Sequence, residues 1–136
     1  MYKNILVPVA FDANRDTSTA LDVAEAIAEE GAQITALHVM EEIPAYVAQY
    51  LPEGQIADNL QNMADIIRKN LGAHEKIKVK VAEGHPAHSI IDYAKMHDID
   101  CVVIASHRPG GVTDFLLGST AARVVRRAPC SVHVVR

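Results

Sequence analysis

The sequence predicts an α/β fold, a doubly wound five-stranded parallel sheet with helices on both faces. Short runs of branched apolar residues alternate with longer segments that repeat apolar residues at helical spacing. The order is strand, helix, strand, helix, strand, helix, strand, helix, strand, which is typical of helices that cross between parallel strands. The chain has 136 residues and no internal repeat, low-complexity tract or linker, so residues 1–136 are expected to form a single domain.

The first two predicted strands enclose a short helix. Residues 5–9 form an apolar run that is predicted as the first strand. Asp16 or Thr17 can cap the helix that follows, and Gly31 is expected to end it. The apolar face of this helix consists of Leu21, Ala24, Ile27 and Ala28. Residues 33–40 are predicted as the second strand.

A long irregular segment is predicted at residues 41–54, because it contains two prolines and a glycine. It also carries Tyr46 and Tyr50. Long loops are either packed on the body or functional. The segment is therefore either a lid packed on the body or a cover over a ligand or a partner surface.

The middle of the chain is predicted to form a helix, a strand and a helix. The first helix is long and amphipathic and ends at Gly72; its apolar stripe is Ile56, Leu60, Met63, Ile67 and Leu71. Residues 76–81 alternate lysine with branched apolar residues, which predicts an edge strand with one solvated face. Gly84 and Pro86 open the next helix. Its inward residues are Ile90, Ile91 and Ala94, with Met96 as a further candidate.

The last third of the chain concentrates glycines and polar residues in one place. Residues 100–104 are predicted as a buried strand, and the small-residue loop 105–111 leaves its carboxyl end. The step Gly118-Ser119 opens a helix that includes residues 121–127, and residues 131–135 form the last strand. Open α/β sheets bind ligands at the carboxyl ends of their strands. Backbone N–H groups at a helix start favour a phosphate.

Composition narrows the functional classes. The chain is 49% hydrophobic with a formal net charge of −4, so its charge does not point to nucleic acid. Its longest apolar runs are too short to cross a bilayer, and no basic region precedes an apolar signal core, so the protein is expected to be cytoplasmic. Cys101 and Cys130 are expected to be buried thiols, without a disulfide or a metal role.

Six different short motifs follow one another along nearly the whole chain. They are residues 5–9, Leu37-His38-Val39, Glu83-Gly84-His85-Pro86, Ala105-Ser106-His107-Arg108, Gly118-Ser119 and residues 128–135. Together they resemble the universal stress protein family, most closely its small, single-domain, universal stress protein F-like branch. The resemblance implies a Rossmann-like fold of the adenine nucleotide alpha hydrolase-like type. It also implies an ATP-binding stress-response protein that forms homodimers.

The nucleotide motif of the family is only partly present. Nucleotide-binding members carry two glycines that are separated by two residues. Nine further residues separate the second glycine from a third, and Ser or Thr comes directly after the third. Gly118-Ser119 matches the second part, whereas Ala105 and Arg108 replace the two earlier glycines. Arginine restricts the backbone but offers a guanidinium that can pair with phosphate in bidentate fashion. Gly110 and Gly111 can supply flexibility instead, so binding with altered phosphate contacts is expected.

A second departure from the family lies after the first strand. Family members usually carry Asp there, near the adenine and ribose, whereas this chain has Ala10, with Asp12 as the nearest acid. Backbone groups of Pro8, Val9 and Val39 can still hold adenine, because such contacts need no particular side chain.

These residues make up a predicted site for ATP, ADP or AMP, with or without Mg²⁺. Its members are Pro8, Val9, Ala10, Asp12, Val39, Ala105, Ser106, His107, Arg108, Gly111, Gly118, Ser119 and Thr120. Ser106 and Ser119 either contact phosphate or act as a turn former and a helix N-cap. Arg123 is either a solvated residue or a phosphate contact. His107 is either a surface group or a proton shuttle. Neither a metal site nor a catalytic residue is predicted.

Two functions remain open. The first is a dimeric, nucleotide-binding stress sensor, in which the ligand biases a two-state element. The second is a nucleotide-independent adaptor or regulatory partner of another protein, such as a transporter. Slow ATP hydrolysis or self-phosphorylation is conceivable, but a dedicated enzyme is not expected. The resemblance implies a homodimer through the last strand, Ser131 to Val135, and neither nucleic acid nor membrane insertion is expected.

Overall fold

The computed structural model, which describes residues 1–9, 15–72, 74, 76–106 and 118–136, contains a five-stranded sheet. Within these residues the strand order is β3-β2-β1-β4-β5, and every neighbouring pair is parallel. The strands are β1 (Tyr2–Pro8), β2 (Ala28–Met40), β3 (Lys78–Glu83), β4 (Cys101–Ala105) and β5 (Ser131–Val135). The predicted fold class is confirmed, and the lysine-rich strand β3 is an edge strand as predicted.

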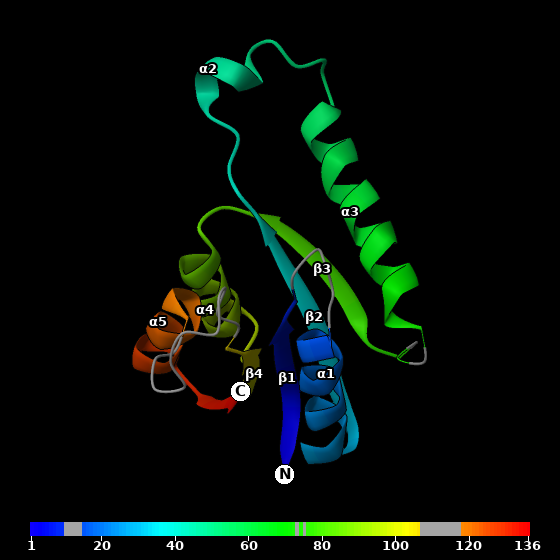
Figure 1. The fold of residues 1–136 in the computed structure, drawn as a ribbon, viewed down its shortest axis with the longest axis vertical. Helices are drawn as coiled ribbons and strands as arrows, with labels where there is room; N and C mark the ends of the chain where they lie inside the picture. Colours follow the sequence, from blue (N-terminus) through cyan, green and yellow to red (C-terminus); the bar gives the residue numbers. More distant parts are fainter. Residues whose placement is uncertain (10–14, 73, 75, 107–117) are drawn as a thin grey trace.

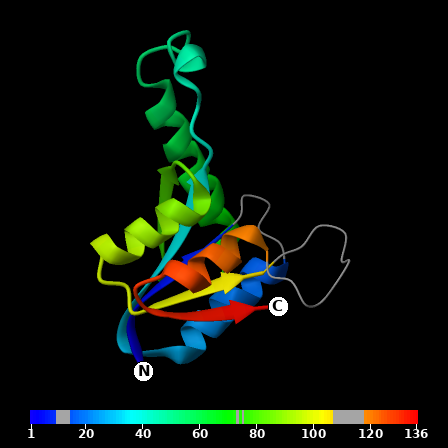
Figure 2. The same cartoon turned by 90° about the vertical axis from the view of Figure 1, so that its left-hand side faces the viewer.

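The helices cover both faces of this sheet. They are α1 (Arg15–Ile27), α2 (Ala45–Ala48), α3 (Gln55–Leu71), α4 (Pro86–Met96) and α5 (Ser119–Arg127). The helices α1 and α3 pack on one face, and α4 and α5 on the other (Figures 1 and 2). None of the helices in the described part of the chain is long and apolar enough to span a membrane.

The side chains of the central strands point alternately to the two faces of the sheet, which explains why the core has two layers. Ile5 and Val7 of β1 belong to the cluster on the α1 side, whereas Leu6 belongs to the cluster on the α4 side. All three are fully buried. Successive side chains of a strand point to opposite faces, so an apolar run without alternation suits a strand covered on both sides. Helices on both faces are therefore already implied by this short run.

Several element boundaries differ from the predicted ones. The strand β1 spans residues 2–8 rather than 5–9, β3 spans 78–83 rather than 76–81, and β4 spans 101–105 rather than 100–104. The helix α1 already begins at Arg15, so the expectation that Asp16 or Thr17 caps it is wrong.

The first helix ends at Ile27 rather than Gly31, because Ala28 already pairs with Tyr2 as the first residue of β2. The register then shifts before Gln33 pairs with Asn4, and Gly31 lies within this irregularity at φ 80°. A glycine tolerates this positive φ, so it marks a bulge rather than the helix end.

The Met96 candidate for the core was wrong. Its side chain is 77% exposed, whereas Ala94 is buried. Two residues along a helix correspond to about 200° of rotation, so Met96 points away from the face that carries Ala94. The inward placement of Ile90 and Ile91 is confirmed.

The segment between β2 and β3 forms an arm, defined here as residues 41–63, that extends beyond the sheet (Figure 1). Within it α2 buries no residue, and α3 buries only Ile67 and Leu71, which lie past the arm. Tyr46 and Tyr50 are 71% and 82% exposed. The two tyrosines are thus not packed on the body, and the interpretation of this segment as a cover over a ligand or a partner surface remains.

Asp100 ties the start of β4 to the start of β1. Its carboxylate accepts hydrogen bonds from the backbone N–H of Lys3 at 2.8 Å and of Asn4 at 3.1 Å. The Asp100 N–H donates in turn to the Asn4 carbonyl at 2.9 Å. The amide of Asn4 donates to the His97 carbonyl at 2.7 Å, so the turn before β4 is held as well.

We expect Asp100→Asn to lower the free energy of unfolding by about 1 kcal/mol, because an amide nitrogen cannot accept from a second backbone N–H. Urea denaturation measures the change. Asp92→Asn is the matched control, since Asp92 is exposed on α4 and its one ion-pair contact with a described residue is at 3.9 Å to His88. A control that loses as much stability as Asp100→Asn would contradict the assigned role.

The two cysteines lie on opposite faces of the sheet. Cys101, in β4, belongs to the α1-side cluster, whereas Cys130 packs against the α4-side cluster. Both thiols are free; Cys101 is buried as predicted, but Cys130, just before an edge strand, is only partly buried. Their placement on different faces disfavours a disulfide between them. Burial and then the charge of Asp100 raise the pKa of Cys130.

We expect Cys101 to make stability fall in alkaline solution. Burial, followed by the charges of Cys130 and Asp100, raises the pKa of Cys101 from its ordinary 9.0 to about 11. The unfolded chain therefore ionises first, so the stability contributed by the neutral thiol is complete below pH 9.0 and is lost as the pH approaches 11. The stability gap between wild type and Cys101→Ala, measured by urea denaturation, should narrow over this range. A constant gap would contradict the prediction.

Candidate functional site

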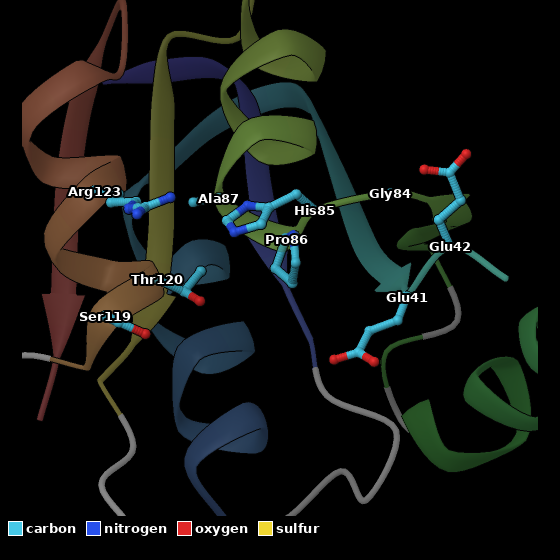
Figure 3. Close-up of a pocket in the computed structure, with 9 residues that line it drawn as sticks. All are labelled: Glu41, Glu42, Gly84, His85, Pro86, Ala87, Ser119, Thr120 and Arg123. Carbon is cyan, nitrogen blue, oxygen red and sulfur yellow. The ribbon is translucent and has the colours of Figure 1, made fainter. Parts of the chain in front are cut away.

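A cavity of about 510 Å³ opens where the carboxyl ends of β2 and β3 meet the start of α5 (Figure 3). Its lining residues are Glu41, Glu42, Gly84, His85, Pro86, Ala87, Ser119, Thr120 and Arg123. They come from three segments: the one after β2, the one that joins β3 to α4, and the first turns of α5. This is the edge of a parallel sheet at which ligands are expected.

The first turn of α5 forms one wall of the cavity. Gly118 is its N-cap, at φ −59° and ψ 155°, and no side chain of the described residues caps the helix. The expectation that Ser119 acts as N-cap is therefore wrong, because Ser119 is already the first helical residue. The first N–H groups of a helix have no intrahelical acceptor and carry partial positive charge. Ser119 and Thr120 thus bring hydroxyls and backbone donors to the same wall.

The start of α4 forms the wall beside it. His85 is the N-cap in extended conformation, without a side-chain cap, and Pro86 opens the helix. Before them, Gly84 has φ 147°, and its N–H donates to the Met40 carbonyl at 2.8 Å. A Cβ at this position would lie 2.8 Å from Ser89 Oγ. Only glycine therefore fits at position 84 without strain. The hydrogen bond from Gly84 to Met40 joins the ends of β2 and β3 at the cavity.

Charges of both signs face the cavity. Figure 3 shows Arg123 and His85 along the wall formed by α4 and α5, and the Glu41 carboxylate pointing into the cavity from the opposite side. The Glu42 carboxylate points away from it. The cavity therefore offers an anion a guanidinium and two helix starts on one side, and presents a carboxylate on the other.

The structure places only some of the predicted site residues together. Among those it describes, Ser119 and Thr120 line the cavity, and Gly118 directly precedes them. Pro8 and Val39 lie at or near the carboxyl ends of β1 and β2. The predicted residues Ala10, Asp12, His107, Arg108 and Gly111 lie outside the described residues.

The backbone of Val9 is engaged with β2. Its N–H donates to the Leu37 carbonyl at 2.8 Å, and its carbonyl lies 2.9 Å from Nδ1 of His38. The side chain of Val9 is buried, with 7% exposed. An adenine at the end of β1 would therefore have to use the remaining lone pair of this carbonyl rather than the N–H.

Ser106, directly after β4, contacts both Gly118 before α5 and the end of β5. Its Oγ accepts from the Gly118 N–H at 3.1 Å, and its own N–H donates to the Val135 carbonyl at 2.8 Å. Ala105, the last residue of β4, pairs with Val135. This geometry corresponds to the turn-forming role of Ser106, while its hydroxyl proton can still donate to a ligand.

Sequence reasoning missed Glu41 and His85 and left Arg123 undecided. The motif that contains His85 contributed to the family resemblance, but no spacing rule connects position 85 with position 119. The structure connects them because α4 and α5 pack beside each other. Within the described residues, no group of three or more His, Cys, Asp or Glu side chains could hold a metal ion.

The parallel strand order, with a cavity at the carboxyl edge, defines a Rossmann-like α/β protein. The chain belongs to the universal stress protein family, whose profile matches residues 1–136. It is similar to universal stress protein YxiE of Bacillus subtilis (strain 168), with 30% identity over 153 residues that cover 100% of both chains. Among solved structures, it is similar to UspA from Lactobacillus plantarum, with a TM-score of 0.70, 32% identity and coverage of 99% and 98%.

Two further solved structures share the fold and were determined with ligands. A universal stress protein in complex with cAMP matches with a TM-score of 0.64 and 23% identity, covering 99% of this chain and 97% of that one. The universal stress protein from Archaeoglobus fulgidus in complex with dAMP matches with a TM-score of 0.59 and 21% identity, covering 99% and 98%.

Proposed function

We propose that this protein is a regulator that binds an adenine nucleotide, ATP or a smaller one, in the cavity at the start of α5. The observation that carries the proposal is the uncapped first turn of α5, where Ser119 and Thr120 open onto a cavity that Arg123 also lines. Neighbours of the same fold were solved with cAMP and dAMP, which supports an adenine nucleotide as the ligand.

The residues present suit a phosphate. Backbone N–H groups at a helix start and two hydroxyls can donate to phosphate oxygens, and the helix dipole favours the negative charge. Arg123 can add a charge-assisted hydrogen bond from the next turn of α5. The cavity volume of about 510 Å³ lies within the usual range for small-molecule sites. The role is binding, without dedicated catalysis.

The sensor role requires a second copy, for which β5 is the proposed contact. The strand β5 pairs only with β4 in the described sheet, so its other edge is open to pairing. Antiparallel pairing of Ser131 to Val135 across a two-fold axis would form a dimer. Light scattering with and without nucleotide tests this part of the proposal, and a monomer under both conditions would refute it.

The decisive test identifies the bound molecule. Mass spectrometry of small molecules released on denaturation should find an adenine nucleotide near one per chain. Calorimetric titration with AMP, ADP and ATP, with and without Mg²⁺, then measures affinity. Protein that is purified empty and binds none of them at millimolar concentration would overturn the nucleotide-binding function.

The exposed arm favours a second candidate function, an adaptor that acts without nucleotide. The arm, residues 41–63, contains four acidic side chains and no Lys, Arg or His. The arm also exposes Tyr46 and Tyr50, and tyrosine is enriched at protein interfaces. This chemistry suits a partner with an apolar centre and a basic rim. The titration separates the two functions, because an adaptor of this kind needs no nucleotide.

We expect the double substitution Tyr46→Ser and Tyr50→Ser to change the free energy of unfolding by less than about 0.5 kcal/mol, since both side chains are exposed. Nucleotide affinity should also stay the same, because neither tyrosine lines the cavity. Urea denaturation and calorimetry check both points. A large loss of stability would show that the arm is packed in solution.

A further inference from the structure

Glu41 is the one acidic side chain that Figure 3 shows pointing into the cavity. Its carboxylate faces the wall that carries Thr120 and Arg123, which is where the proposed nucleotide would place its phosphate. No described basic side chain forms an ion pair with Glu41. The negative charge of Glu41 is therefore uncompensated among the described residues.

The backbone on both sides of Glu41 is held in place. On one side, the Met40 carbonyl accepts from the Gly84 N–H at 2.8 Å. On the other, the Ile43 N–H donates to Glu83 Oε1 at 3.3 Å. Residues 40–43 are thus attached to the end of β3, which keeps the Glu41 carboxylate at the mouth of the cavity.

A carboxylate in this position acts differently on ligands of different charge. A single phosphate at the start of α5 gains the helix dipole and Arg123. Each additional phosphate that extends into the cavity brings more negative charge toward Glu41, and like charges at short range repel. A divalent cation reverses the effect, because it neutralises phosphate charge and carboxylates are good oxygen ligands for Mg²⁺.

We propose that Glu41 makes this cavity select nucleotides by phosphate charge: a monophosphate binds directly, whereas a triphosphate binds well only together with a divalent cation. The inference rests on the proposed nucleotide-binding function and adds its ligand preference. The cation here accompanies the ligand and needs no preformed cluster of protein ligands.

The test compares AMP and ATP by calorimetry, in EDTA and in millimolar Mg²⁺, for wild type, Glu41→Gln and Glu53→Gln. In EDTA at low ionic strength, wild type should bind ATP about tenfold more weakly than Glu41→Gln does, and high salt should reduce this difference. AMP affinity should barely depend on Mg²⁺ in any variant. The control Glu53→Gln removes the same charge from the exposed arm, away from the cavity lining, and should behave like wild type.

The outcomes separate the two claims. AMP and ATP can both bind with a ratio of affinities that changes neither with Mg²⁺ nor in Glu41→Gln. In that case the charge selection is wrong and the nucleotide-binding function stands. Charge selection by Glu41 is equally wrong if Glu53→Gln shifts ATP affinity as much as Glu41→Gln does, because a general charge effect then suffices. If no variant binds either nucleotide under any condition, both claims fail together.

Discussion

Replacing Gly84 by alanine should lower the free energy of unfolding by about 2–3 kcal/mol. Gly84 has φ 147°, a conformation that costs an L-residue about 1–3 kcal/mol. The new Cβ would also lie 2.8 Å from Ser89 Oγ, so the Ser89 side chain or the start of α4 must shift. Urea denaturation with an unchanged m-value would measure this loss.

Two further variants separate the backbone strain from the contact. Gly54→Ala also forces a residue with a Cβ into positive φ, at 82°, but the added atom meets nothing within 4 Å. It should cost only about 1 kcal/mol. Ser89→Ala combined with Gly84→Ala removes the close contact and should recover only part of the loss. If Gly84→Ala were as stable as wild type, the assigned conformation at the cavity wall would be wrong.

The same substitution has a functional consequence. Gly84 lines the cavity, and its N–H holds the end of β2 through the Met40 carbonyl. A shift of Gly84 would move the start of α4 and the anchored Glu41 together. Nucleotide affinity should therefore fall in Gly84→Ala but not in Gly54→Ala, which lies in the arm.

The fold was predictable because the central strands carry an unambiguous pattern. Ile5, Leu6 and Val7 are all apolar, as expected for a short strand that is buried on both faces. The stripe on α3 similarly identifies a helix, and Gly72 ends it as predicted. These signals are local, so they can be read without knowing which strands are neighbours.

The site was less predictable because its residues are far apart in the sequence, and only the order of the strands brings them close together. Glu41 follows β2, His85 follows β3 and Arg123 lies on α5, so more than 80 positions separate the first from the last. No local pattern marks any of them, and Arg123 resembles the solvated Arg126 in the same helix. Ser119 was recognised because a Gly-Ser step before a helix is a local signal, even though Gly118 proved to be the cap.

Replacing Arg123 by alanine should weaken nucleotide binding about thirtyfold, which corresponds to about 2 kcal/mol for a charge-assisted hydrogen bond to phosphate. Arg123 lines the cavity one turn after Ser119. Arg123→Lys keeps the charge but loses bidentate geometry, so its affinity should lie between those of the wild type and the alanine variant. Calorimetry with AMP in EDTA avoids any contribution from a divalent cation.

Arg126→Ala is the matched control for this prediction. It removes the same charge from the same helix, and both arginines are exposed, but only Arg123 lines the cavity. If a phosphate sits at the start of α5, Arg123→Ala should therefore weaken binding much more than Arg126→Ala does. Equal losses would mean that α5 attracts the nucleotide only by its overall charge, and the phosphate position would have to be sought elsewhere. An unchanged affinity in both variants would leave the helix start and its hydroxyls as the only phosphate contacts on this wall, which Thr120→Val would then test.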